Sequence, residues 1–179
     1  FEDAIAMGPE WAAAYLSLGE ALCANDEHAR GARTLLEGAD TAKRASHVLH
    51  MCECNALAFK SLCRADCSKE PKPPWWTDEQ LLTLSHAAIT SSPLSDAVWA
   101  MRAVVLQGGI VIDAPWHPDG RSAAHLQLAA DAWHRHATLA GPFDFERAEE
   151  SKQLAAAARG SAEYLAVHHR TLAARSELD

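Results

Sequence analysis

Alanine is the residue that most constrains the fold of this chain. It accounts for 37 of the 179 residues, whereas valine and isoleucine together number only ten. Alanine has the highest intrinsic helix propensity, and the β-branched residues that favour strands are scarce. The sequence therefore predicts an all-α fold and argues against a β-sandwich or a doubly wound sheet.

The length and the apolar fraction of 49% suit one folded domain that spans residues 1–179. The chain begins at Phe1, inside a helical pattern and without an initiator methionine or a targeting segment. We therefore expect the sequence to be an excerpt of a longer protein.

Charge and hydropathy argue against nucleic-acid binding and against a membrane span. Acidic residues outnumber basic ones by 24 to 16, which gives a net charge of −8. Nucleic-acid-binding domains normally carry a basic stripe, and the densest basic stretch here is Lys43-Arg44. No apolar run approaches the ~18 residues of a membrane span. The sequence therefore predicts neither a nucleic-acid partner nor a transmembrane segment.

A recurring order of large, small and proline residues indicates a helical repeat. Residues 15–22 are Tyr-Leu-Ser-Leu-Gly-Glu-Ala-Leu, and small and large residues follow as Ala32, Leu36 and Ala39. A related order surrounds two later prolines, as Ala88, Pro93 and Trp99 and as Ala130, Ala137 and Pro142.

This pattern resembles the tetratricopeptide (TPR) repeat family, whose unit is a helix–turn–helix of about 34 residues. The resemblance implies a TPR-like α-solenoid of about four antiparallel helix pairs, in which small residues let neighbouring helices approach and large ones fill the seams. We expect the helices near residues 1–7, 10–24, 27–39, 42–67, 78–91, 95–108, 121–140, 144–158 and 161–176.

Two long loops, at residues 68–77 and 108–120, each separate the first helix of a unit from the second. Both contain Pro-Trp, and Thr77-Asp-Glu-Gln80 is a capping box that starts the helix after the first loop. The loop tryptophans Trp75, Trp76 and Trp116 have two interpretations. They either anchor a protein partner, as tryptophans at interfaces often do, or fold back over the helical stack.

The TPR family binds peptide segments on a concave face formed by the first helix of each unit. Carried over by position, the resemblance implies a partner-binding surface of Ala13, Leu16, Glu20, Ala97, Ala100, Met101 and Val104. Some members clamp a terminal carboxylate with basic and amide groups, but Leu16, Glu20 and Ala97 stand at those positions here. An apolar surface with one acid instead suits a hydrophobic or weakly basic segment.

Histidines and cysteines gather in one predicted helix, as His47, His50, Cys52, Cys54, Cys63 and Cys67. Soft ligands of these types can bind Zn²⁺ or Cu⁺. One straight helix cannot wrap them around an ion, however, because its ends would lie about 30 Å apart. We therefore favour buried cysteines that replace alanine at helix seams, and no metal site. With Cys23 the thiols number five, which favours reduced cysteines and an intracellular, reducing compartment.

Catalytic motifs are weak in this sequence. His117 and Asp119 form one possible acid–base pair next to Arg121, but Asp119-Gly120 is also an ordinary turn. No nucleophile elbow, paired catalytic carboxylates or glycine-rich phosphate loop accompanies the pair, and His134 is expected to be a packed core residue. The sequence therefore predicts no enzyme and no cofactor.

The predicted function is a non-enzymatic scaffold, or a structural subunit of a larger assembly, that binds a protein partner on the concave face. One alternative is a regulatory or positioning domain attached to a catalytic region outside this excerpt. Another is a metal- or redox-responsive module that uses the Cys/His-rich helix.

Overall fold

The computed structural model describes residues 1–65, 73–108 and 121–176, and within these ranges the chain is helical, with short turns and no strand. The predicted all-α class is therefore confirmed. Eight helices occur there in chain order, namely α1 (Glu2–Met7), α2 (Ala12–Ala24), α3 (His28–Arg44), α4 (Val48–Arg64), α5 (Asp78–Ser91), α6 (Asp96–Gln107), α7 (Ala123–Ala140) and α8 (Phe145–Ser176).

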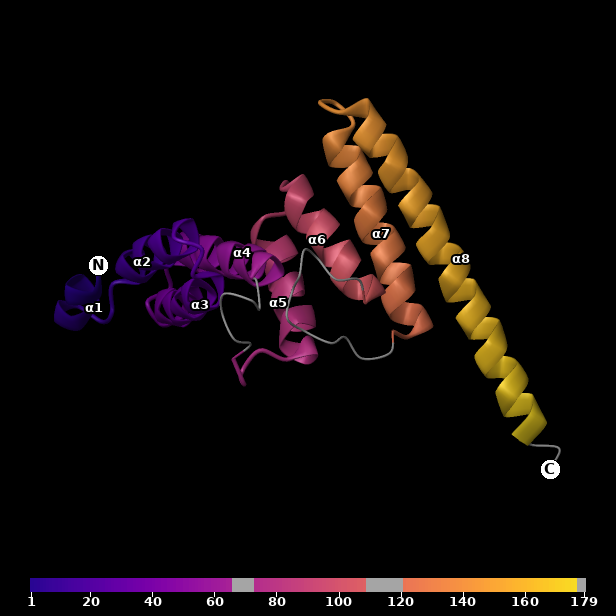
Figure 1. Ribbon diagram of the computed structural model, residues 1–179, viewed down its shortest axis with the longest axis horizontal. Coiled ribbons are helices and arrows are strands. Elements are labelled where there is room, and N and C mark those ends of the chain that lie inside the picture. Colours follow the sequence, from indigo (N-terminus) through magenta and orange to yellow (C-terminus); the bar gives the residue numbers. More distant parts are fainter. Residues whose placement is uncertain (66–72, 109–120, 177–179) are drawn as a thin grey trace.

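The helices follow one another along the long axis of the molecule (Figure 1). Helices α1 to α4 form one end, α5 and α6 lie in the middle, and the long α7–α8 hairpin forms the other end. Each helix packs mainly against the next helix in the sequence, with smaller contacts between α2 and α4 and between α4 and α6. Packing is therefore dominated by neighbours in the chain.

The turn between α3 and α4 lies at residues 45–47, later than the predicted break at residues 40–41. Ser46 has a left-handed φ of 59°, and the N–H of His47 donates to the carbonyl oxygen of Ala42 at 2.8 Å. A left-handed residue followed by such a bond ends a helix as a Schellman motif. Because the left-handed residue is serine and not glycine, the sequence alone does not indicate this helix end.

Helix α8 is continuous, whereas the sequence predicted two helices at residues 144–158 and 161–176. Gly160 lies in its middle, and a Cβ added there would meet nothing within 4 Å. A glycine inside a helix costs about 1 kcal/mol relative to alanine, which is too little to break a helix packed along its side. That packing comes from a stripe of small buried residues along α8, Ala148, Ser151, Ala155, Ala158 and Ala162.

Helices α2 and α3 approach so closely that glycine is required at their crossing. A Cβ added at Gly31 would lie 2.5 Å from the sulfur of Cys23 and 3.0 Å from the backbone oxygen of Gly19. A Cβ added at Gly19 would in turn lie 2.4 Å from Leu35. These contacts are too short for any side chain, so the two glycines set the distance between the first two long helices.

Replacing Gly31 by alanine should lower the free energy of unfolding by about 1–3 kcal/mol, because the added methyl group overpacks the crossing. The matched control, Gly160→Ala, should raise it by about 0.5–1 kcal/mol, because the new side chain enters open space and alanine favours helix. Urea unfolding followed by circular dichroism at 222 nm measures both. Equal effects of the two substitutions would contradict the close approach of α2 and α3.

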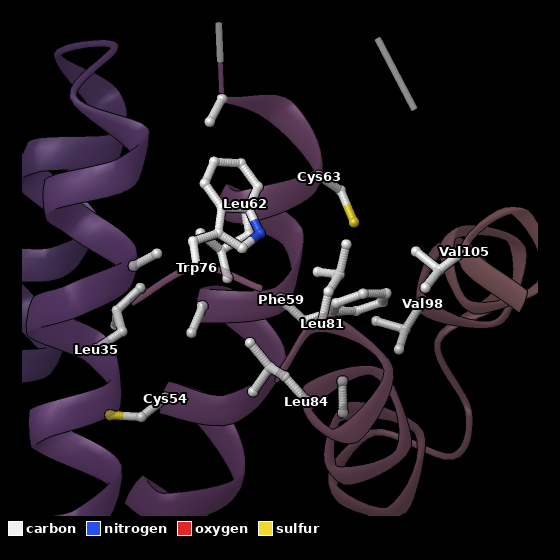
Figure 2. Packing of buried hydrophobic residues seen from close by; sticks show 14 of the residues in the cluster. Leu35, Cys54, Phe59, Leu62, Cys63, Trp76, Leu81, Leu84, Val98 and Val105 are labelled. Carbon is white, nitrogen blue, oxygen red and sulfur yellow. The ribbon is translucent and has the colours of Figure 1, made fainter. Parts of the chain in front are cut away.

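The main core lies between α3, α4, α5 and α6 (Figure 2). Phe59 and Leu62 of α4 and Leu81 of α5 are at most 2% exposed, and the indole of Trp76 belongs to the same cluster. A second, smaller cluster joins the last three helices through Ala103, Ala132, Trp133 and Ala155. These clusters hold successive helices together from α3 to α8.

A buried ion pair connects the start of α5, the end of α6 and the start of α7. The guanidinium of Arg121 donates to both carboxylate oxygens of Asp78, at 2.6 and 2.8 Å, and both charged side chains are at most 6% exposed. Arg121 also donates two bonds to the backbone oxygen of Val105, at 3.0 and 2.8 Å. The anion lies at the first residue of α5 and the cation at the last turn of α6, where each helix dipole stabilises it.

Candidate binding groove

The residues predicted to form the concave face differ in their exposure and in the core cluster that they contact. Ala13 and Glu20 are exposed on α2, and Ala97 is half-buried on α6. Leu16 and Met101 pack against the main core cluster. Ala100 and Val104 pack against the cluster that α6 forms with α7 and α8. Of the set, Glu20 lines a pocket of about 250 Å³ between α2 and α4, whose other walls include Cys23, His28, Lys60, Ser61 and Arg64.

The two adjacent tryptophans at the start of α5 have different surroundings. The backbone N–H of Trp76 donates to the carbonyl oxygen of Pro73 at 3.1 Å and closes a turn. Thr77 then caps α5, because its hydroxyl oxygen accepts a bond from the backbone N–H of Gln80. Trp76 is only 1% exposed, which fits the second of its two interpretations and not a partner anchor: its indole folds back over the helices. Trp75 is half-buried and packs on the edge of the core. Trp116 lies outside the described residues.

Trp75 stands in a groove between α3 and α5, with α4 at its base. Two adjoining pockets of about 500 and 290 Å³ form this groove, and both are lined by Leu36, Asn55, Trp75 and Gln80. The larger pocket is also lined by Leu62, Glu79, Thr83, Leu84 and Ala87. The smaller one is also lined by Arg33, Glu37, Ala39 and Asp40. We call these two pockets together the Trp75 groove.

The indole of Trp75 is held by a charged neighbour. The guanidinium carbon of Arg33 lies 5.7 Å from the centre of the indole ring, within the range of a cation–π contact. The Nε of Arg33 also donates to a carboxylate oxygen of Glu37 at 2.9 Å, one helical turn later. The exposed pair contributes little stability, but it orients the cation over the ring. Arg33 therefore contacts both the indole of Trp75 and the carboxylate of Glu37.

The rim of the Trp75 groove is acidic and rich in amide groups. Asp40 on α3 and Glu79 on α5 make no ion pair with any residue that the structure describes. The side-chain amides of Asn55 and Gln80 likewise form no hydrogen bond within that part of the chain. The groove therefore has space for a large apolar side chain. Its own carboxylates and amides lie beside that space and can form ion pairs and hydrogen bonds.

Sequence reasoning named Trp75 but missed the residues around it. The sequence places Asn55 in the predicted helix at residues 42–67, Gln80 in a capping box and Leu36 at a seam between two helices. No local pattern links these side chains, because they come from three helices that meet only in the folded chain.

The cysteine- and histidine-rich helix does not form a metal centre among the described residues, where no three His, Cys, Asp or Glu side chains are placed to share an ion. Cys54 and Cys63 are both 0% exposed and lie at opposite ends of the core cluster in Figure 2. Burial raises the pKa of Cys54 to about 11 and that of Cys63 to about 12, so both remain thiols at neutral pH. Cys67 lies outside the described residues.

A Ser–His–Asp arrangement that the sequence did not reveal joins α6, α7 and α8. The Oγ of Ser151 donates to the backbone oxygen of Arg147 at 2.7 Å, so it must accept from Nδ1–H of His136 at 2.8 Å. The other ring nitrogen of His136 is buried, has no hydrogen-bond partner among the described residues, and lies 4.0 Å from Asp96. With His136 at 1% and Ser151 at 2% exposure, this group is closed to a substrate.

From the sequence, His134 of α7 is expected to be packed in the core. His134 is exposed in the structure, and the prediction is therefore wrong. His134 and His136 are two residues apart and so face different sides of the helix. The possible acid–base pair of His117 and Asp119 lies outside the described residues. Its neighbour Arg121 belongs to the buried ion pair with Asp78.

Stability should fall in mild acid because of His136. Burial, and to a smaller extent the charge of Arg147, lowers the pKa of His136 below its ordinary value of 6.5, although nearby Asp96, Asp144 and Glu150 oppose this. The unfolded chain therefore binds the proton more readily, and the folded state loses stability as the pH falls from 6.5 towards the lowered pKa.

In His136→Asn, the dependence of the urea midpoint on pH between about 7.5 and 5.5 should be flatter than in the parent chain. His134→Asn is the matched control, because it removes an exposed imidazole from the same helix. If both variants keep the parental slope, His136 does not control the acid sensitivity.

Among the described residues, no helix is long and apolar enough to cross a membrane. Comparison of the chain with protein-family models, with curated proteins and with solved structures finds no match.

Proposed function

We propose that this chain is a non-enzymatic protein-binding scaffold whose helix pairs stack as a TPR-like α-solenoid. The order of contacts supports this arrangement, because each helix packs on its sequence neighbour and alternate helices α2, α4 and α6 also touch. Stacked pairs of this kind bury their apolar faces on one another and present extended surfaces for binding.

The observation that carries the proposal is the half-buried Trp75, oriented by Arg33 and flanked by the two pockets of the groove. Tryptophan is enriched among the residues that dominate binding energy, especially where an apolar pocket adjoins it. Its immediate neighbour Trp76 is buried for stability, so Trp75 remains for a partner. We propose that the partner segment binds in the Trp75 groove.

The concave face is a second candidate surface. Its support is the pocket between α2 and α4 that Glu20 lines with Lys60 and Arg64. Apolar and charged groups lie side by side in this pocket, as in many peptide sites. Its small volume, about 250 Å³, makes it secondary to the Trp75 groove.

Affinity capture from the native cells, with quantitative mass spectrometry of the bound proteins, tests both surfaces. Trp75→Ala should reduce recovery of the specific partner at least about thirtyfold, as expected for loss of a dominant interface residue. Tyr164→Ala removes another exposed aromatic, 69% exposed on α8, and should leave recovery unchanged. Glu20→Arg should have no effect if the concave face is not used.

Each variant must keep the parental helical circular dichroism and remain folded under the capture conditions before it is compared. If folded Trp75→Ala recovers the same partners at parental levels, the Trp75 groove is not the docking surface. If Glu20→Arg alone abolishes recovery, the concave face is the binding surface instead.

A further inference from the structure

We propose that the Trp75 groove takes an extended basic peptide and not a helix. A large apolar side chain of the peptide enters the larger pocket, the peptide backbone bonds to Asn55 and Gln80, and a lysine or arginine beside the apolar residue faces Asp40 and Glu79. This inference rests on the proposed function, because it names the partner class of the same groove.

The larger pocket selects the apolar side chain. Leu36 of α3, Leu62 of α4 and Leu84 of α5 line it together with Trp75, and its volume of about 500 Å³ exceeds that of any single side chain. Burying a leucine or phenylalanine there removes apolar surface of both partners from water. The indole adds a flat ring against which an aromatic side chain can stack.

The two amide side chains favour an extended backbone. Asn55 and Gln80 line both pockets, and each offers one acceptor oxygen and two donor hydrogens. Neither amide group is used within the part of the chain that the structure describes. A helical ligand bonds its own N–H and C=O groups internally, whereas an extended one leaves them free for such partners. Unused amides along a groove therefore match an extended peptide.

The charges of the groove favour a basic peptide. Asp40 lies at the α3 wall and Glu79 at the α5 wall, and neither carboxylate forms an ion pair with a described residue. The cation of the groove, Arg33, is paired with Glu37 and lies over Trp75. An incoming lysine or arginine is therefore attracted from both walls, and an acidic peptide is repelled.

Nuclear magnetic resonance titration of the ¹⁵N-labelled chain tests the inference with one defined probe, acetyl-Ser-Arg-Phe-Arg-Ser-amide. The backbone and side-chain amide signals of Asn55 and Gln80 and the indole N–H of Trp75 should shift together and saturate. A probe with glutamate in place of both arginines should bind at least about tenfold more weakly, and so should one with alanine in place of phenylalanine.

Variants of the chain separate the two parts of the proposal. Asn55→Leu and Gln80→Leu should each weaken binding of the basic probe about threefold to tenfold, the effect of one lost hydrogen bond. Asp40→Asn with Glu79→Gln should weaken it and reduce its dependence on salt. Glu146→Gln with Glu163→Gln removes two exposed acids from α8 and should leave binding unchanged.

Three results would overturn the inference. The first is the absence of any groove shift with the basic probe at about 5 mM, well above a millimolar dissociation constant. The second is equal binding of the glutamate probe, and the third is full binding by the two leucine variants. If partner capture still depends on Trp75 in any of these cases, the proposed function stands and only the ligand class is wrong. If capture does not depend on Trp75 either, both proposals fail.

Discussion

Removing the carboxylate of Asp78 in Asp78→Ala should lower the free energy of unfolding by about 3–5 kcal/mol. The substitution leaves the guanidinium of Arg121 buried at 5% side-chain exposure and without its two carboxylate bonds. Breaking a buried ion pair by removing one partner is among the most destabilising single changes in a protein. Urea or guanidinium unfolding followed by circular dichroism measures the loss.

The exposed pair of Arg33 and Glu37 provides the control for this prediction. Both of its side chains are more than half exposed, so Glu37→Ala should cost no more than about 0.5 kcal/mol. A loss below about 1 kcal/mol for Asp78→Ala would show that Arg121 finds water or another partner, and that the pair does not connect the three helices.

The Asp78→Ala substitution should also change the conformation of the Trp75 groove. Asp78 is the first residue of α5, and Glu79 and Gln80 of the groove follow it directly. When the ion pair is lost, the first turn of α5 loses its connection to α6 and α7. We therefore expect the side-chain amide signal of Gln80 to shift in Asp78→Ala, whereas that of Asn55, on α4, changes less.

Trp76→Ala should be as costly as the loss of the ion pair, about 3–5 kcal/mol. The indole is 1% exposed and packs in the cluster of Phe59, Leu62 and Leu81. Truncation removes the free energy of transferring the ring from water and leaves a large cavity between α4 and α5. The unfolding midpoint in urea is the measurement.

Trp75→Ala is the matched substitution one residue earlier in the chain. Because Trp75 is only half-buried, its truncation should cost less than half as much as that of Trp76. The amount of partner captured should fall more for Trp75→Ala than for folded Trp76→Ala. If the two variants are equally destabilised, the tryptophans do not divide between core and surface as the structure has them.

The sequence predicted the helical part of the fold well, for a local reason. Alanine-rich segments with few β-branched residues favour helix wherever they lie, and Thr77 caps the helix at Asp78 through a bond between residues three apart. The starts and ends of the helices on either side of residues 68–77 and 108–120 also follow from local signals, because proline and glycine interrupt helices by backbone geometry alone.

Two helix boundaries escaped prediction, one because its local signal is weak and the other because tertiary contacts decide it. The end of α3 depends on left-handed Ser46, which has no sequence signature as clear as glycine. The continuity of α8 through Gly160 depends on contacts with α7, which outweigh the weak helix propensity of one glycine.

At the candidate site, the difference between what local sequence and what tertiary packing determine is larger still. The sequence by itself determined that the chain is helical, acidic, and supplied with tryptophans in its proline-rich loops. Only the tertiary structure decided that Trp76 enters the core while Trp75 meets Asn55 and Gln80 in a groove. Helix propensity acts between residues a few positions apart, whereas burial depends on which helix lies opposite, and that is decided when the whole chain packs.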